Sequence, residues 1–150
     1  HHLTCHLMYG HGFLIPIPDI DHTDFMLILG GNPLASNGSL MTVPDVEKRL
    51  KAIQARGGKL VVVDPRHTET AAIADQHLFI RPGQDAALLL GMLNTLFEEN
   101  LGRASHLPIA GLDELRGAVA PFDADRMAAR CGVPAGTIRQ IGRAAWTERV

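Results

Sequence analysis

The sequence has few cysteines, and their spacing excludes the common metal-binding and redox frameworks. Its two cysteines, Cys5 and Cys131, stand far apart and form no CxxC pair. Zinc-finger and iron–sulfur spacings are therefore absent from this chain. Lone thiols of this kind are typical of a reducing compartment, so we expect a cytoplasmic location, the alternative being export directed by an upstream signal.

Aromatic residues and long apolar runs are also scarce. No apolar stretch approaches the roughly 18 residues that a membrane-spanning helix requires, so we expect no membrane segment in this chain. Aromatic residues make up 5% of the sequence, the basic residues do not cluster, and the formal net charge is −2. We therefore expect no nucleic-acid partner, because such surfaces need basic patches and stacking platforms.

What remains is the composition of an ordinary globular domain. The chain has 150 residues, of which 46% are hydrophobic and 20% are charged, which suits one folded domain with one core. Because the chain does not begin with Met, we expect a domain excised from a larger protein. We predict a lead-in segment at residues 1–18 and a single α/β domain at residues 19–150.

The lead-in segment holds Cys5, His6 and His11 among apolar residues. These side chains do not repeat at the spacing of a zinc finger or on one helical face, so we assign no metal ligand here. The segment is interpreted as a loosely structured stretch that lies on the domain, or as a piece of a neighbouring domain.

Three short apolar runs occur in the first part of the chain, at residues 25–29, 60–63 and 77–80. Runs this short, bounded by Gly and Pro, are typical of buried strands of a parallel sheet. Between the first two runs, residues 34–41 are predicted to form a polar loop. Thr42-Val43-Pro44-Asp45 follows and has the form of a capping box that begins a helix. Helices are predicted at 86–97, 112–119, 124–131 and 134–145. The fold class is therefore α/β, a Rossmann-like open parallel sheet with helices on both faces and a helical C-terminal tail.

Polar and glycine residues follow each of the three predicted strands. Because the carboxyl ends of parallel strands meet at one edge of a sheet, we expect these loops to converge there, where ligands bind in open α/β sheets. The candidate binding residues are Gly30, Gly31, Asn32, Pro33, Ser36, Asp64, Pro65, Arg66, Thr68, Gly83, Gln84 and Asp85.

The chemistry of these side chains favours a nucleotide-like ligand. Carboxylates such as Asp64 and Asp85 can accept from a ribose diol or from the N1–H and N2–H₂ edge of guanine, and Arg66 with backbone N–H groups suits a phosphate. The alternative for Asp64 and Arg66 is a mutual ion pair that closes the strand end. No GxGxxG, P-loop, Ser-His-Asp or HExxH pattern is present, so we expect no catalytic residue and no metal ligand in this chain.

Three motifs in order resemble the molybdopterin oxidoreductases, the formate dehydrogenase, nitrate reductase and dimethyl sulfoxide reductase group. They are Gly30-Gly31-Asn32-Pro33-Leu34-Ala35-Ser36, Val61-Val62-Val63-Asp64-Pro65-Arg66-His67-Thr68-Glu69-Thr70-Ala71 and Arg81-Pro82-Gly83-Gln84-Asp85-Ala86-Ala87-Leu88. The resemblance covers about residues 16–148. It departs from the family at Gln84, where Thr or Ser is common.

This resemblance implies the cofactor-binding domain of a catalytic subunit. The cofactor would be bis-(molybdopterin guanine dinucleotide) with molybdenum or tungsten, held by its guanosine and phosphate end. Gly31, Asn32 and Ser36 would line the phosphates, Asp64 would meet the nucleoside, and Gly83–Asp85 the guanine or ribose. The metal ligand, and any iron–sulfur cluster, would lie in missing parts of the protein, so the isolated chain would be inactive.

The partners implied are other domains of the same polypeptide and electron-transfer subunits. Two alternative functions stay open from the sequence. One is the scaffold domain of the large iron–sulfur subunit of respiratory complex I, which lacks molybdenum. The retained Asn32, Asp64, Arg66 and Asp85 weigh against it. The other is a generic nucleotide-binding module, which the missing GxGxxG weakens.

Overall fold

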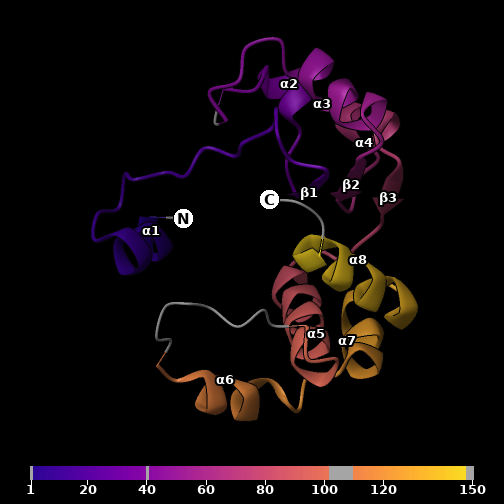
Figure 1. Ribbon diagram of the computed structural model, residues 1–150. Coiled ribbons are helices and arrows are strands. Elements are labelled where there is room, and N and C mark those ends of the chain that lie inside the picture. Colours follow the sequence, from indigo (N-terminus) through magenta and orange to yellow (C-terminus); the bar gives the residue numbers. More distant parts are fainter. Residues whose placement is uncertain (1, 40, 102–109, 148–150) are drawn as a thin grey trace.

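The core of the molecule is a parallel sheet of three strands. The computed structural model describes residues 2–39, 41–101 and 110–147. Within them, β1 (Phe25–Leu29), β2 (Lys59–Val63) and β3 (Gln76–Leu78) lie in the order β1-β2-β3 (Figure 1). Phe25 pairs with Lys59, and Val61 pairs with Gln76. The strand predicted at 77–80 is observed as β3, which begins at Gln76 and ends at Leu78 because the chain then leaves the sheet to reach the next helix.

Helices cover both faces of this sheet, as the sequence predicted. The helices that the structure describes are α1 (His2–Tyr9), α2 (Pro33–Ser36), α3 (Val46–Ala55), α4 (Glu69–Ile73), α5 (Asp85–Glu98), α6 (Leu112–Val119), α7 (Ala124–Cys131) and α8 (Ala135–Thr147). Helices α5, α7 and α8 pack against one another and form a separate layer from α2, α3 and α4 (Figure 1). The Rossmann-like α/β class with a helical C-terminal part is thereby confirmed.

Alternation along β2 divides the apolar residues between two cores. Successive side chains of a strand point to opposite faces, so Leu60 and Val62 pack with α3 and α4, whereas Val61 and Val63 pack with α5, α7 and α8. All four side chains are buried. A strand that is buried on both faces needs an uninterrupted apolar run, which is why this run was visible in the sequence.

Some helix boundaries follow from side-chain caps. The Thr68 hydroxyl accepts a hydrogen bond from the Ala71 N–H at the start of α4, and the Asp123 carboxylate accepts one from the Arg126 N–H at the start of α7. Each satisfies one of the backbone donors that the first turn of a helix leaves unpaired. Cys131 is fully buried at the end of α7, as expected for a thiol that acts as a small apolar side chain.

The segment between β1 and α3 differs from its prediction. Residues 33–36 form the short helix α2 rather than part of a polar loop. The predicted capping box is wrong: α3 begins at Val46, and Asp45 precedes it with φ +56° and no side-chain cap. The physical reason is burial, because Val43 turns inward to join Val46 in the core beneath α3. The sequence also predicts a loop at residues 100–110, between the helices predicted at 86–97 and 112–119, and most of that range lies outside the described residues.

The lead-in segment contains a helix, contrary to the prediction of a loosely structured stretch. Helix α1 stands apart from the sheet and its helices (Figure 1), and Ile20 is where the chain enters the core. Large apolar side chains are exposed throughout the segment, namely Leu3, Leu7, Met8, Tyr9, Phe13, Leu14, Ile15 and Ile17. The boundary at residue 18 remains a prediction. No helix in the described ranges is both long and apolar enough to cross a membrane.

Candidate functional site

The first candidate loop leaves the carboxyl end of β1. Gly30 has φ +61°, which favours glycine, and its N–H donates to the Val63 carbonyl at 2.8 Å, so the loop stays attached to β2. A Cβ at Gly31 would lie 3.1 Å from the Cγ2 atom of Ile28. Pro33 is buried at the start of α2. A Cβ at Gly30, in contrast, would meet no other atom of the described residues within 4 Å.

Asn32 joins this loop to the next one. Its Nδ2 donates to the Glu69 carboxylate at 2.6 Å, and its Oδ1 accepts from the Thr70 hydroxyl at 2.7 Å and from the Thr70 N–H at 3.3 Å. The Thr70 hydroxyl accepts from the Leu34 N–H at 3.2 Å. The amide oxygen and one amide hydrogen are therefore used within the protein. Asn32 thereby holds the two loops together, and its contact with a phosphate stays a prediction.

Asp64 is the buried acid of the site, with 8% of its surface exposed. It lies directly after β2, and its Oδ1 accepts a hydrogen bond from the Arg66 N–H at 2.7 Å. No ion pair joins the Asp64 carboxylate to the Arg66 guanidinium in the described part of the chain, so that alternative is wrong. The Asp64 carboxylate fixes the turn through the backbone instead, and the Arg66 side chain is exposed.

The remaining candidate residues lie in the loop after β1, the first loop, and in the loop after β2, the second loop. Thr68 is buried and its hydroxyl is used as the cap of α4, so its role is positioning. Pro65 is exposed in the turn. Ser36 is exposed at the end of α2, where its N–H donates to the Asn32 carbonyl at 3.1 Å. The first two loops are thus brought together by hydrogen bonds, with the Asp64 carboxylate and the Arg66 guanidinium left for a ligand.

His77 lies beside Asp64 and was not among the candidate residues identified from the sequence. Its Nε2 donates to the Asp64 carbonyl at 3.0 Å, which leaves Nδ1 as a buried acceptor that has no partner in the described residues. Its ring stacks at a tilt on Phe79, with centroids 4.2 Å apart, and meets the His67 ring edge-on at 5.1 Å. The alternation of His77 with Leu78 was a signal, because it places His77 on the opposite face from the buried leucine.

The third loop is held by α7. The Arg81 N–H donates to the Cys131 carbonyl at 2.8 Å, and its guanidinium donates to the carbonyls of Ala129 and Arg130 at the C-terminus of α7. Gly83 has φ +74°, Gln84 is the N-cap of α5 without a side-chain bond, and Asp85 is the first residue of α5. No hydrogen bond joins this loop to the other two within the described ranges, so its convergence with them stays a prediction.

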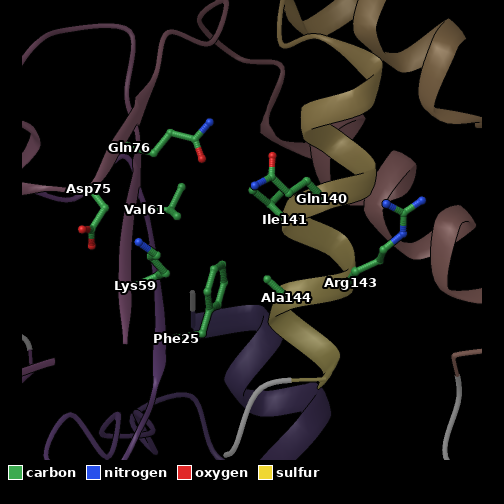
Figure 2. A pocket seen from close by; sticks show the side chains of 9 residues that line it. All are labelled: Phe25, Lys59, Val61, Asp75, Gln76, Gln140, Ile141, Arg143 and Ala144. Carbon is green, nitrogen blue, oxygen red and sulfur yellow. The ribbon is translucent and has the colours of Figure 1, made fainter. Parts of the chain in front are cut away.

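A cleft of about 700 Å³ opens at the opposite, amino edge of the sheet. Figure 2 shows it between the starts of the strands and α8. Its lining residues are Phe25, Lys59, Val61, Asp75, Gln76, Gln140, Ile141, Arg143 and Ala144. In open α/β sheets ligands bind outside the carboxyl ends of the strands, so this cleft does not form part of the candidate site.

The Asn32–Glu69 contact makes a prediction about pH. The hydrogen bond from Asn32, helped by the Glu69 N–H and by the charge of Arg66, lowers the pKa of Glu69 below its ordinary value of 4.5. A depressed pKa adds stability that is present above the unfolded-state pKa and is lost as the pH falls through the folded-state pKa. We expect the stability advantage of wild type over Glu69→Gln to be present at pH 7 and to shrink below pH 4.5, as measured by urea denaturation.

Glu114→Gln, on the exposed surface of α6, is the control for general effects of acid. If wild type were more stable than Glu69→Gln by the same amount at pH 3 and at pH 7, the Glu69 carboxylate would contribute nothing to stability through its charge.

Comparison with known proteins places this geometry in a family. The sequence profile described as "Molybdopterin oxidoreductase" matches residues 4–120. Formate dehydrogenase H of Escherichia coli (strain K12) is 33% identical over 141 residues, which is 92% of this chain and 19% of that protein. The assimilatory nitrate reductase catalytic subunit of Bacillus subtilis (strain 168) is 31% identical over 131 residues, which is 86% of this chain and 18% of that subunit.

A solved structure agrees with these sequence relatives. Acetylene hydratase from Pelobacter acetylenicus superimposes with a TM-score of 0.75 and 33% sequence identity, covering 88% of this chain and 18% of that one. The chain therefore spans less than a fifth of the length of these relatives.

Proposed function

This chain belongs to the molybdopterin oxidoreductase family, and from that premise we propose that its α/β domain holds the guanosine and phosphate end of a molybdopterin guanine dinucleotide. Family membership implies a molybdopterin cofactor that carries molybdenum or tungsten. The dinucleotide form and the end that this domain holds are the proposal. The observation that carries it is the buried Asp64 carboxylate at the carboxyl end of the central strand.

The donor and acceptor groups of the site fit a guanosine. Asp64 is held in one orientation by the Arg66 N–H, and its Oδ2 makes no hydrogen bond within the described residues. A fixed carboxylate can accept the two parallel donors on the guanine edge or a ribose diol. In this proposal Asp64 is the nucleoside anchor, and the amide of Gln84 and the carboxylate of Asp85 supplement it.

The phosphates would lie against the first loop. Open space lies beside Gly30, whose own N–H is bonded to the Val63 carbonyl, and the guanidinium of Arg66 has no hydrogen bond or ion pair in the described part of the chain, although its charge lowers the pKa of Glu69. Backbone N–H groups and an arginine fork are the usual partners of phosphate oxygens. Asn32 fits as the residue that keeps this loop beside Asp64, because its amide bonds already lead to Glu69 and Thr70.

The chemistry of the whole protein would come from the cofactor. When bound, the cofactor supplies oxo or hydride transfer, and this chain's residues bind and orient it. One relative is named a hydratase, whereas others are named dehydrogenases and a nitrate reductase. Proteins with such different names share this domain, so we infer that the reaction and its substrate are set by other domains, and that the isolated chain is inactive.

The lead-in segment supports the proposal that other domains of the same polypeptide are its partners. Residues 1–18 contain no Asp, Glu, Lys or Arg, and large apolar side chains of α1 and the following turn are exposed. Exposed apolar patches of this kind mark contacts with protein or with a membrane, and the first suits neighbouring domains of a longer chain. Electron-transfer subunits, an iron–sulfur cluster elsewhere in the protein and a cytoplasmic location belong to the same proposal.

The test is the binding of a guanine nucleotide. We expect the chain to bind GMP, and Asp64→Ala to weaken the affinity by about tenfold, or about 1.4 kcal/mol, because a charge-assisted hydrogen bond is lost. Isothermal titration calorimetry measures both affinities. AMP should bind more weakly than GMP, since adenine lacks the N1–H and N2–H₂ donors that pair with a carboxylate.

Asp113→Ala is the matched control, because Asp113 is exposed on α6 and lies outside the three loops. If wild type and Asp64→Ala bound GMP with equal affinity, and circular dichroism showed both proteins to be folded, the proposed role of Asp64 would be contradicted. Equal affinities for GMP and AMP would contradict recognition of guanine.

A further inference from the structure

Arg81 begins the third sequence motif, yet it was not among the candidate binding residues. Its backbone N–H donates to the Cys131 carbonyl at 2.8 Å, and its guanidinium donates to the Ala129 carbonyl at 2.6 Å and to the Arg130 carbonyl at 3.2 Å. The two side-chain acceptors lie 48 and 49 positions further along the chain, at the end of α7. This contact therefore joins the third loop to a helix that is distant in the sequence.

The end of α7 is a favourable acceptor for a guanidinium. The last four carbonyls of an α-helix have no N–H partner within the helix, and the helix dipole places partial negative charge there. Gly132 ends α7 with φ +83°, and its N–H donates back to the Ala128 carbonyl. Arg81 supplies donors to the next two carbonyls, those of Ala129 and Arg130. Charge and geometry thus both favour this contact.

The aliphatic stem of Arg81 is held as well as its guanidinium. A Cβ on Gly132 would lie 3.4 Å from the Cγ, 3.6 Å from the Nε and 3.9 Å from the Cδ of Arg81, so the stem runs along this glycine. Ile80, which precedes Arg81, and Val133, which follows Gly132, are buried in the same apolar core. Packing therefore keeps the two chain segments together, and the hydrogen bonds of Arg81 set how the third loop leaves them.

The polar candidates of the third loop follow Arg81 within one turn. The Gln84 N–H donates to the Arg81 carbonyl at 3.2 Å, and the Leu88 N–H donates to the Gln84 carbonyl at 3.1 Å, where α5 begins. The Gln84 side chain makes no capping bond to α5, and Asp85 is the first residue of that helix. The placement of both side chains therefore depends on the backbone that Arg81 holds.

We propose that Arg81 is a positioning residue, whose bonds to the end of α7 hold the third loop where Gln84 and Asp85 meet the nucleoside. The inference rests on the proposed function, and Arg81 itself makes no contact with the ligand. It also gives the helical C-terminal part a task in binding. Helix α7 follows the last described strand of the sheet and packs against α5 (Figure 1), and it reaches the site through Arg81.

Titration of Arg81 variants with guanosine and with GMP tests this role. We expect Arg81→Ala to weaken the binding of both ligands by the same factor, about tenfold, because a loop without its anchor must be ordered on binding. Arg81→Lys should recover part of the affinity, since an ammonium can still donate to a carbonyl of α7. Isothermal titration calorimetry measures the affinities, and circular dichroism shows that each variant is folded.

Arg126→Ala is the matched control. Arg126 also lies on α7 and donates to a backbone carbonyl, that of Pro121, but it stands at the start of the helix and pairs with Asp123. This variant should bind both ligands as wild type does. Hydrogen exchange without ligand gives a second readout. The Gln84 amide should exchange about tenfold faster in Arg81→Ala than in wild type, whereas the Met127 amide should be unchanged.

Three outcomes would overturn the positioning role. Weaker binding of GMP with unchanged binding of guanosine would show that Arg81 contacts the phosphate. Equal losses in Arg81→Ala and Arg126→Ala would assign the effect to the general stability of α7. Unchanged affinities, or unchanged exchange at Gln84, would show that the loop holds its place without Arg81. If wild type bound neither ligand, the proposed function would be contradicted instead, and the exchange of the Gln84 amide alone would decide whether Arg81 fixes the loop.

Discussion

Replacement of Gly38 by alanine is expected to destabilise the domain by about 3 kcal/mol or more, combining left-handed backbone strain with overpacking. Gly38 is buried beneath the first loop with φ +68°. A Cβ there would lie 2.4 Å from the Val43 carbonyl oxygen and 3.1 Å from the Val46 Cβ. The carbonyl cannot move easily, because the Val43 N–H donates to the Gly38 carbonyl. Urea denaturation of the two proteins measures the difference.

Gly57→Ala separates the two contributions to this loss. Gly57 has φ +90°, and its Cβ would meet nothing within 4 Å, so this variant carries backbone strain without a steric clash. We expect a loss of about 1–2 kcal/mol for Gly57→Ala. If both variants lost the same stability, the close approach of Gly38 to Val43 would have no energetic weight.

The sequence predicted the strands well because their burial on both faces leaves a simple signature. Leu60–Val63 is apolar throughout, and each of its side chains is buried. A run of that length cannot form an amphipathic helix, so the choice of a strand was physically constrained. The parallel order followed from the alternation of strands and helices, because connections of that kind are right-handed.

The segment around Gly38 could not be predicted from the same rules. Ser36, Asn37 and Ser39 are exposed, and such polar residues suggested a loop. The burial of Gly38 and Val43 depends on α3, which packs over them after a change of direction at Asp45. Contacts of this kind arise from tertiary packing, and no local pattern records them. The capping box failed for the same reason, since the burial of Val43 overrode a local preference.

Within the candidate site, residue types were easier to predict than roles. Asp64 and Arg66 were identified as polar groups at a strand end, but no ion pair joins them in the part of the chain that the structure describes, where the Asp64 carboxylate accepts from the Arg66 N–H instead. Asn32 was expected to line phosphates, which stays a prediction, and its amide bonds to Glu69 and Thr70 are a second role that the sequence did not reveal. Partners more than 35 positions apart cannot be assigned from spacing, because either loop could turn in several ways.

Asn32→Ala is accordingly expected to lower the free energy of unfolding by about 3 kcal/mol, since two buried donors of Thr70 lose their acceptor. Thr70 is fully buried, with 0% of its surface exposed, so its hydroxyl and N–H are shielded from bulk water. The first loop would also lose its bond to Glu69 and separate from the start of α4. Urea denaturation measures the loss, and faster exchange of the Leu34 amide would report the loosened loop.

A double-mutant cycle isolates the bond between Asn32 and Thr70. Thr70→Val removes the hydroxyl while retaining the shape of the side chain, so Asn32→Ala should cost less in that background than in wild type. The difference is the coupling energy, which we expect to be about 1 kcal/mol or more, as for residues in one hydrogen-bond network. Glu69→Gln keeps an acceptor for the Asn32 amide, so its coupling energy with Asn32→Ala should be smaller than that of Thr70→Val with Asn32→Ala.

Strict additivity of Asn32→Ala and Thr70→Val would mean that each residue stabilises its own loop separately. In that case Asn32 would be free to turn its amide to a phosphate, the role that its motif implied.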